Sequence, residues 1–191
     1  ALLVKSYVEI AAYGLSLYLA DYYKSELLDY CASAYDPEKF GEDPAPLVQL
    51  NKYNEREYIL ELWHGPTAAF KDMALQVLPY LMTAAIRKTG EKSKICILAA
   101  TSGDTGKAAL EGFKDVPGTE VIVFYPSKGV SEAQRLQMIT TEGSNVHVVA
   151  VEGTFDDAQT GVKNIFADEA FATSLREKNV ILSSANSINV G

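Results

Sequence analysis

The sequence has few of the residues that mark metal sites and disulfide scaffolds. It contains 2 cysteines and 2 histidines among 191 residues, and neither pair lies at the spacing of a CxxC or His/Cys metal motif. Without such spacing, a zinc site or a disulfide framework has no support. We therefore expect no bound metal and a reducing compartment, the cytoplasm.

Positive charge and long hydrophobic runs are also scarce. Lys and Arg number 17 against 25 Asp and Glu, which gives a formal net charge of -8. Because phosphate backbones are bound by clustered Lys and Arg, this balance argues against a nucleic-acid partner. No stretch approaches the roughly 20 apolar residues that a membrane-spanning helix needs. The 48% hydrophobic residues instead indicate a packed core.

The two ends of the sequence are unlike those of a complete domain. The chain begins without Met and directly in a helical pattern, and it stops soon after a strand signal at residues 180–182. We expect it to be part of a longer protein.

Helical patterns come first in the sequence, and strands alternate with helices later. Apolar spacing predicts helices at residues 3–19 and 22–35, and a proline-rich stretch at 36–56 predicts a loop that can include a poor edge strand. Strands are then predicted at 58–63, 95–100, 121–125, 146–151 and 180–182. The helices between them are predicted at 70–88, from the loop at 101–106 to about 114, at 131–141 and at 156–177.

This alternation predicts an α/β fold, in which a parallel sheet has helices on both faces. We expect a helical N-terminal portion at residues 1–57 and an α/β domain at residues 58–191 that is incomplete at its C-terminus. The continuous apolar character of residues 95–100 and 146–151 predicts strands that are buried on both faces.

Lys71 stands in an unusual place for a lysine. Thr67 is a candidate N-cap of the helix that follows, and Asp72 suits a first turn. The helix dipole and the apolar neighbour Phe70 both favour the neutral amine, so we expect a lowered pKa for Lys71. A neutral amine can attack an aldehyde and form a Schiff base. From the residues alone, a solvent-facing lysine without a function is the alternative.

A glycine-containing loop, residues 101–106, follows the apolar strand at 95–100. Ligands bind outside the carboxyl ends of the strands in open parallel sheets. The two glycines let the backbone approach a ligand, and the Ser and Thr residues add hydroxyl donors beside a helix start, so we expect a pocket for a carboxylate or phosphate. Asp104 would repel such an anion, and we interpret it as an N-cap or loop-stabilising residue. A tight turn that binds nothing is the alternative.

The histidines and Cys96 have structural interpretations. His64 lies in a Gly-Pro turn that it helps to place, and His147 lies within a strand. Cys96 sits inside an apolar run and is interpreted as a small buried hydrophobe.

Three segments resemble the motifs of threonine synthases, in the same order and at the same spacing. Residues 60–72 resemble the cofactor-lysine motif, residues 100–106 a second signature, and residues 184–189 a third. The stretch 125–131, followed by Gln134 and Gln137, is also similar to that family. Threonine synthases are a branch of the fold type II pyridoxal-phosphate enzymes, relatives of tryptophan synthase β and cysteine synthase.

The resemblance implies a pyridoxal-5′-phosphate-dependent lyase that converts O-phospho-L-homoserine and water to L-threonine and phosphate. It implies that Lys71 forms the Schiff base with the cofactor and later moves protons, and that Asn186 contacts the cofactor. It assigns the substrate carboxylate to Thr101, Ser102, Gly103, Asp104 and Thr105. The glycine-rich cup for the cofactor phosphate and the partner of the pyridine nitrogen lie downstream of this chain in the family.

Two other functions stay open on the same motifs. A threonine-synthase-like phospho-lyase would eliminate phosphate and release a 2-keto acid, and a non-catalytic relative would keep only the fold. Cysteine synthases have Asn at the position of Asp104, which favours the threonine synthase branch.

Overall fold

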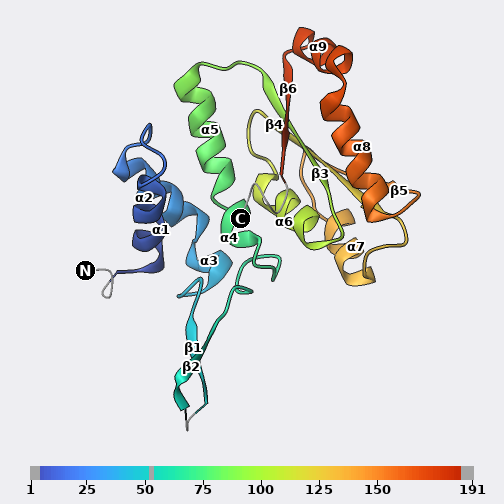
Figure 1. Ribbon diagram of the computed structural model, residues 1–191. Coiled ribbons are helices and arrows are strands. Elements are labelled where there is room, and N and C mark those ends of the chain that lie inside the picture. Colours follow the sequence, from blue (N-terminus) through green and yellow to red (C-terminus); the bar gives the residue numbers. More distant parts are fainter. Residues whose placement is uncertain (1–4, 52–53, 186–191) are drawn as a thin grey trace. The chain divides into compact units, whose positions relative to one another are not determined.

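The computed structural model describes residues 5–51 and 54–185 (Figure 1). The chain forms two compact units, residues 1–73 and residues 74–191. The domain boundary that the sequence indicates after residue 57 stays a prediction. Within the described ranges, no helix is both long and apolar enough to cross a membrane.

The first unit begins with three helices, α1 (Tyr7–Ser16), α2 (Lys24–Ala34) and the short α3 (Pro37–Phe40). Helix α1 starts at a capping box, in which Ser6 and Glu9 bind each other's backbone N–H groups. The core of this unit is aromatic and aliphatic, and contains Leu27, Cys31, Ala34, Tyr35 and Phe40. The predicted helices at 3–19 and 22–35 are thus present in shorter form.

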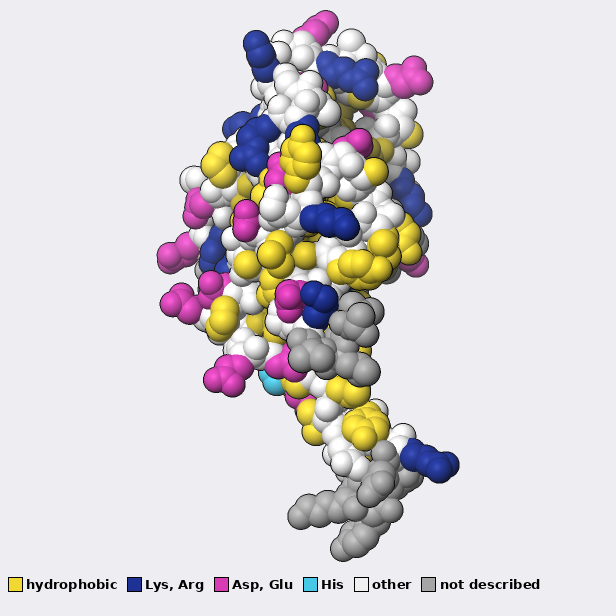
Figure 2. Space-filling view, turned by 90° about the vertical axis from the view of Figure 1, so that its left-hand side faces the viewer, with side chains coloured by type: hydrophobic (Ala, Val, Ile, Leu, Met, Phe, Trp, Pro, Cys, Tyr) yellow, Lys and Arg dark blue, Asp and Glu magenta, His cyan; other side chains and the backbone are white. Residues whose placement is uncertain are grey.

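An antiparallel hairpin follows, formed by β1 (Leu47–Asn51) and β2 (Asn54–Leu60). The strand predicted at 58–63 therefore belongs to the first unit and not to the parallel sheet, because its partner is β1, in the stretch at 36–56 where a loop with a poor edge strand was expected. Its apolar side chains face outward, with Leu47 62% and Leu60 53% exposed. Figure 2 shows hydrophobic side chains along this hairpin.

The second unit is built on a parallel sheet of strands in the order β5-β4-β3-β6. The strands are β3 (Lys94–Ala100), β4 (Thr119–Pro126), β5 (Val146–Val151) and β6 (Val180–Ser184). Helices α5 (Leu78–Thr89), α6 (Asp104–Phe113) and α7 (Glu132–Ile139) pack together on one face, and α8 (Phe155–Ala167) and α9 (Glu169–Glu177) cover the other (Figure 1). The predicted α/β fold with a parallel sheet is confirmed.

The main core lies between the sheet and α6. Alternate residues of β3 and β4 meet the buried face of this helix, and α7 adds Met138 from the side. The residues with the least exposure in this cluster are Leu75, Ala108, Ala109, Leu110, Phe113, Val121, Val123 and Met138. Because sheet and neighbouring helices enclose it, α6 is the most buried helix of the unit.

Two predictions about burial and helix length are wrong. Strand β5 is half-buried or exposed along its length, because it is an edge strand, whereas β3 in the interior of the sheet is buried on both faces as predicted. The helix expected at 156–177 is two helices, separated at Asp168, whose side chain accepts the Phe171 N–H and begins α9.

The helix expected at 70–88 is also divided. It consists of α4 (Asp72–Leu75) and α5, and Pro79 stands in the first turn of α5. Proline suits that place because it lacks the N–H group that a continuous helix would need there.

We expect Phe113→Ala to lower the free energy of unfolding by about 3–5 kcal/mol, because the ring is fully buried in the core. Urea denaturation followed by circular dichroism measures this loss. Phe171→Ala is the matched control, since that ring in α9 is 44% exposed, and its loss should be much smaller. Equal losses would mean that the core is not centred on α6.

Candidate active site

The strand order indicates where a ligand would bind, at the carboxyl edge of the parallel sheet. The chain runs from β3 through β4 to β5 on one side and then places β6 on the other side of β3. The order reverses between β3 and β6, and ligands bind outside the carboxyl ends of strands at such a reversal. Residues 101–106 follow β3 at this point and residues 184–189 begin at the end of β6. Asn186, in the second segment, lies outside the described residues.

Thr101 holds the first of these loops together. Its side chain is buried, and its Oγ1 accepts hydrogen bonds from the N–H groups of Gly103 and Gly106, both at 2.9 Å. Gly103 has a φ of 141°, which favours glycine, and a Cβ there would overlap with the Gln134 amide. The protein itself therefore fixes the backbone of this loop.

The loop presents hydrogen-bond donors toward the carboxyl edge of the sheet. Asp104 and Thr105 are the first residues of α6, where backbone N–H groups have no acceptor within the helix. The positive end of the helix dipole adds to their attraction for an anion. Ser102 is exposed, so its hydroxyl can also reach a ligand. This arrangement can bind a carboxylate or a phosphate.

The carboxylate of Asp104 is bound by other side chains. Its Oδ1 accepts a hydrogen bond from Gln134 Nε2 at 2.9 Å and lies 3.5 Å from Lys107 Nζ. Of the two structural roles that the sequence left open for Asp104, that of N-cap is wrong, because Gly103 occupies the N-cap position of α6.

Lys71 lies in a compact turn of the first unit that is organised by Asp72. The Asp72 carboxylate is fully buried and accepts hydrogen bonds from the backbone N–H and the hydroxyl of Thr67, at 2.8 and 2.7 Å. A Cβ at Gly65 would overlap with the side chains of Asp72 and Phe40. The expectation that Thr67 is a helix N-cap is wrong, because α4 begins only at Asp72.

Tyr35 fixes the chain on the other side of Lys71. Its hydroxyl donates a hydrogen bond to the Met73 carbonyl at 2.6 Å, and burial raises the pKa of Tyr35 well above its ordinary value. Lys71 is half-buried, and its Nζ lies 4.2 Å from the centre of the Phe70 ring, a cation–π distance. In the described part of the chain, no hydrogen bond or ion pair engages this amine. The backbone is thus held while the amine is left for chemistry.

The thiols and imidazoles have structural surroundings. Burial raises the pKa of Cys31 to about 11 and also raises the pKa of the half-buried Cys96, so both thiols are poor nucleophiles at neutral pH. His64 and His147 each bind a glutamate, at 2.6 and 2.9 Å. Among residues 5–51 and 54–185, no group of three or more His, Cys, Asp and Glu side chains could hold a metal ion.

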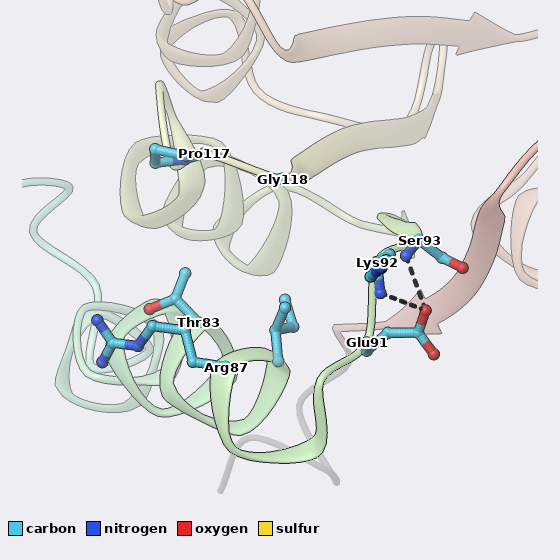
Figure 3. A pocket seen from close by; sticks show the side chains of 8 residues that line it. Thr83, Arg87, Glu91, Lys92, Ser93, Pro117 and Gly118 are labelled. Atoms are coloured by element: carbon cyan, nitrogen blue, oxygen red, sulfur yellow. Dashed lines mark hydrogen bonds between the residues drawn. The ribbon is translucent and has the colours of Figure 1, made fainter.

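A cavity of about 440 Å³ lies at the other end of the strands, before β3 and β4 begin (Figure 3). It is lined by α5 and by the turns that precede β3 and β4, with Thr83, Ile86, Arg87, Glu91, Lys92, Ser93, Pro117 and Gly118. The Glu91 carboxylate faces its own turn, where it accepts the N–H groups of Lys92 and Ser93 (Figure 3). This cavity lies at the amino ends of the strands. It is therefore separate from residues 101–106 at the carboxyl ends, which we call the anion loop.

A family model described as pyridoxal-phosphate dependent enzyme matches residues 39–189. The match covers most of the chain and includes the lysine segment, the anion loop and the segment after β6. The chain belongs to this family of pyridoxal-phosphate-dependent enzymes.

Its relatives within the family include threonine synthases and threonine synthase-like proteins. The chain is 48% identical to threonine synthase of Pseudomonas aeruginosa, over 76% of this chain and 29% of the relative. It is 39% identical to human threonine synthase-like 1, over 97% of this chain and 25% of the relative. The structure resembles the pyridoxal-phosphate-bound threonine synthase of Brucella melitensis with a TM-score of 0.84 and 39% identity, over 98% of this chain and 38% of that one. The chain therefore spans less than half of each of these relatives.

The resemblance to threonine synthases is confirmed, whereas the roles of single residues stay predictions. The sequence did not indicate that Gln134 binds Asp104 or that Tyr35 binds the Met73 carbonyl. One pattern in the sequence could have suggested the first contact. Gln134 and Gln137 lie three residues apart and so share one face of a helix.

We expect Thr101→Val to lower the free energy of unfolding by about 1–3 kcal/mol for each N–H group that loses its acceptor. Thr101→Ser keeps the hydroxyl and should retain most of the stability. Urea denaturation of both variants checks this prediction. If Thr101→Val and Thr101→Ser lowered the free energy of unfolding by the same amount, the hydroxyl of Thr101 would not be what holds the loop.

Proposed function

We propose that the protein carrying this chain is a pyridoxal-5′-phosphate-dependent lyase that converts O-phospho-L-homoserine and water to L-threonine and phosphate. The observation that carries this proposal is the surroundings of Lys71. This half-buried amine has no ion-pair partner in the described part of the chain, while Asp72 and Tyr35 hold the backbone on either side of it. The similarity to threonine synthases supports the choice of reaction.

The residues present in the chain fit pyridoxal phosphate. When bound, this cofactor supplies an aldehyde for a lysine amine and a pyridinium ring that stores electrons. In the described part of the chain no hydrogen bond or ion pair holds the Lys71 amine, so no such contact has to break before the amine forms a covalent link to an aldehyde. The Phe70 ring lies beside this amine, with its centre 4.2 Å from Lys71 Nζ. Asn186 is a second cofactor contact in this proposal, from its motif alone.

Lys71 also serves as the acid and base of the reaction in this proposal. A lysine amine next to the reacting carbons can take a proton from one carbon and return it to another. Such transfers depend on accurate placement. The hydrogen bonds of Asp72 to Thr67 and of Tyr35 to Met73 would supply it, since they hold the backbone and leave the side chain of Lys71 able to move.

Residues 101–105 bind the substrate carboxylate in this proposal. The backbone N–H groups of Asp104 and Thr105 and the hydroxyl of Ser102 are the donors, while Thr101 and Gly103 shape the loop. A small anionic substrate needs only such local donors, so the net charge of -8 is no obstacle to it. The free thiols of both cysteines support the cytoplasm as the compartment.

Borohydride reduction in the presence of pyridoxal phosphate, followed by peptide mapping, should place the label on Lys71. Lys71→Ala should lose the label and keep its circular dichroism spectrum, and threonine formation should fall by a factor of at least about 10². Lys163→Ala, an exposed lysine of α8, is the matched control and should keep label and activity. Label retained after Lys71→Ala would overturn the assignment.

Product analysis decides between the proposed reaction and its alternatives. With O-phospho-L-homoserine, the full-length protein should release phosphate and L-threonine in equal amounts. Phosphate accompanied by a 2-keto acid and ammonia would identify a threonine-synthase-like phospho-lyase, because the two reactions differ in whether water adds to the β-carbon or releases the amino group as ammonia. Neither product, with Lys71 unlabelled, would identify a non-catalytic relative.

A further inference from the structure

Helices α6 and α7 are joined by a cluster of four polar side chains, Asp104 and Lys107 of α6 and Gln134 and Gln137 of α7, which we call the α6–α7 cluster. Gln134 Nε2 donates to Asp104 Oδ1 at 2.9 Å, and Lys107 Nζ donates to Gln137 Oε1 at 3.1 Å. Lys107 Nζ also lies 3.5 Å from Asp104 Oδ1. Asp104 and Lys107 are three residues apart in α6, and Gln134 and Gln137 are three apart in α7. Residues at this spacing lie on the same face of a helix, so one turn of α6 faces one turn of α7.

The α6–α7 cluster balances its charges. Lys107 is only 8% exposed, although a buried cation is costly unless it is paired. Asp104 supplies the opposite charge, and Gln137 takes a further hydrogen bond of the ammonium group. The carboxylate of Asp104 is therefore bound by a neutral donor from α7, Gln134, and by a cation from α6, Lys107.

Helix α7 determines which way the Gln134 amide points. Gln134 is the N3 residue of a capping box, and its Oε1 accepts from the N–H and the hydroxyl of Ser131, at 3.2 and 3.0 Å. With the oxygen used in this way, the nitrogen is the atom left for Asp104. The amide thus offers a donor to Asp104 and not an acceptor.

This contact matters because of where Asp104 stands. It is the first residue of α6, next to the N–H groups that attract an anion. An unbound carboxylate there would repel an anionic ligand and would compete with it for the same N–H groups.

We propose that Gln134 is a positioning residue for substrate binding, which holds the Asp104 carboxylate toward α7 and so leaves the first-turn N–H groups to the substrate carboxylate. Lys107 neutralises the same carboxylate, and Gln137 keeps Lys107 in place. The inference rests on the proposed function, because it assigns a carboxylate-bearing substrate to this loop.

The test is Gln134→Glu in the full-length protein. This variant keeps the oxygen that caps α7 and replaces the donor to Asp104 with a second acceptor. The KM for O-phospho-L-homoserine should rise by about tenfold or more, the effect of losing a hydrogen bond to a charged group. Because the proposal gives Gln134 a role in substrate binding alone, the cofactor label on Lys71 should be unchanged and kcat should fall far less than KM rises.

A second substitution separates positioning from a merely structural role. Combined with Gln134→Glu, Asp104→Asn exchanges donor and acceptor and restores the contact in the opposite direction. The KM of the double variant should return to that of Asp104→Asn alone, which a general loss of structure would not do. Gln159→Glu in α8, where the Gln159 amide accepts a hydrogen bond from Lys163, is the matched control. Should Gln134→Glu not fold, Lys107→Gln with and without Asp104→Asn makes the same test.

The outcomes separate this inference from the proposed function. An unchanged KM in Gln134→Glu, or a double variant as impaired as the single one, overturns the role of Gln134 while threonine formation and the label on Lys71 remain. If the unsubstituted protein forms no threonine and carries no label, the proposed function fails and the inference fails with it.

Discussion

The close packing of α6 is the constraint on which the second unit depends. Glycine is required toward both ends of this helix, because a Cβ at Gly106 would overlap with Thr101 and Val123, and one at Gly112 would overlap with the Leu75 carbonyl. A helix that lies so near the sheet has its position fixed by the core. Its first turn is therefore held at the carboxyl end of β3, where parallel sheets bind ligands. The place of the candidate anion site follows from packing.

The same arrangement occurs in each of two candidate regions, the turn around Lys71 in the first unit and the loop at residues 101–106 in the second. In each, one buried side-chain acceptor binds nearby donors and so fixes the backbone beside a candidate functional group. Asp72 does this beside Lys71 by binding the N–H and hydroxyl of Thr67. Thr101 does it in the loop, where it accepts two backbone N–H groups. Rigid backbone and available reactive groups are what catalysis by positioning requires.

The sequence was sufficient for the class of fold and for the loop at residues 101–106 between β3 and α6, because strand–helix alternation and the glycines after β3 are local signals. It could not show that the strand near Tyr58 pairs in a hairpin, or that Val146–Val151 forms an edge strand, since periodicity records burial and not the partner. The contact of Gln134 with Asp104 spans thirty residues of sequence and became visible only when α7 was placed beside α6.

The enclosure of α6 also restricts how such a protein can change. Six of the ten residues of this helix are buried, so substitutions there that adjust recognition also threaten the fold. Helix α7 has a solvent-facing side, on which Leu136 and Ile139 are exposed, and it reaches the anion loop through Gln134. New substrate preferences are therefore more accessible through variation of α7 than of α6, which makes the outer helix the adaptable half of the pair.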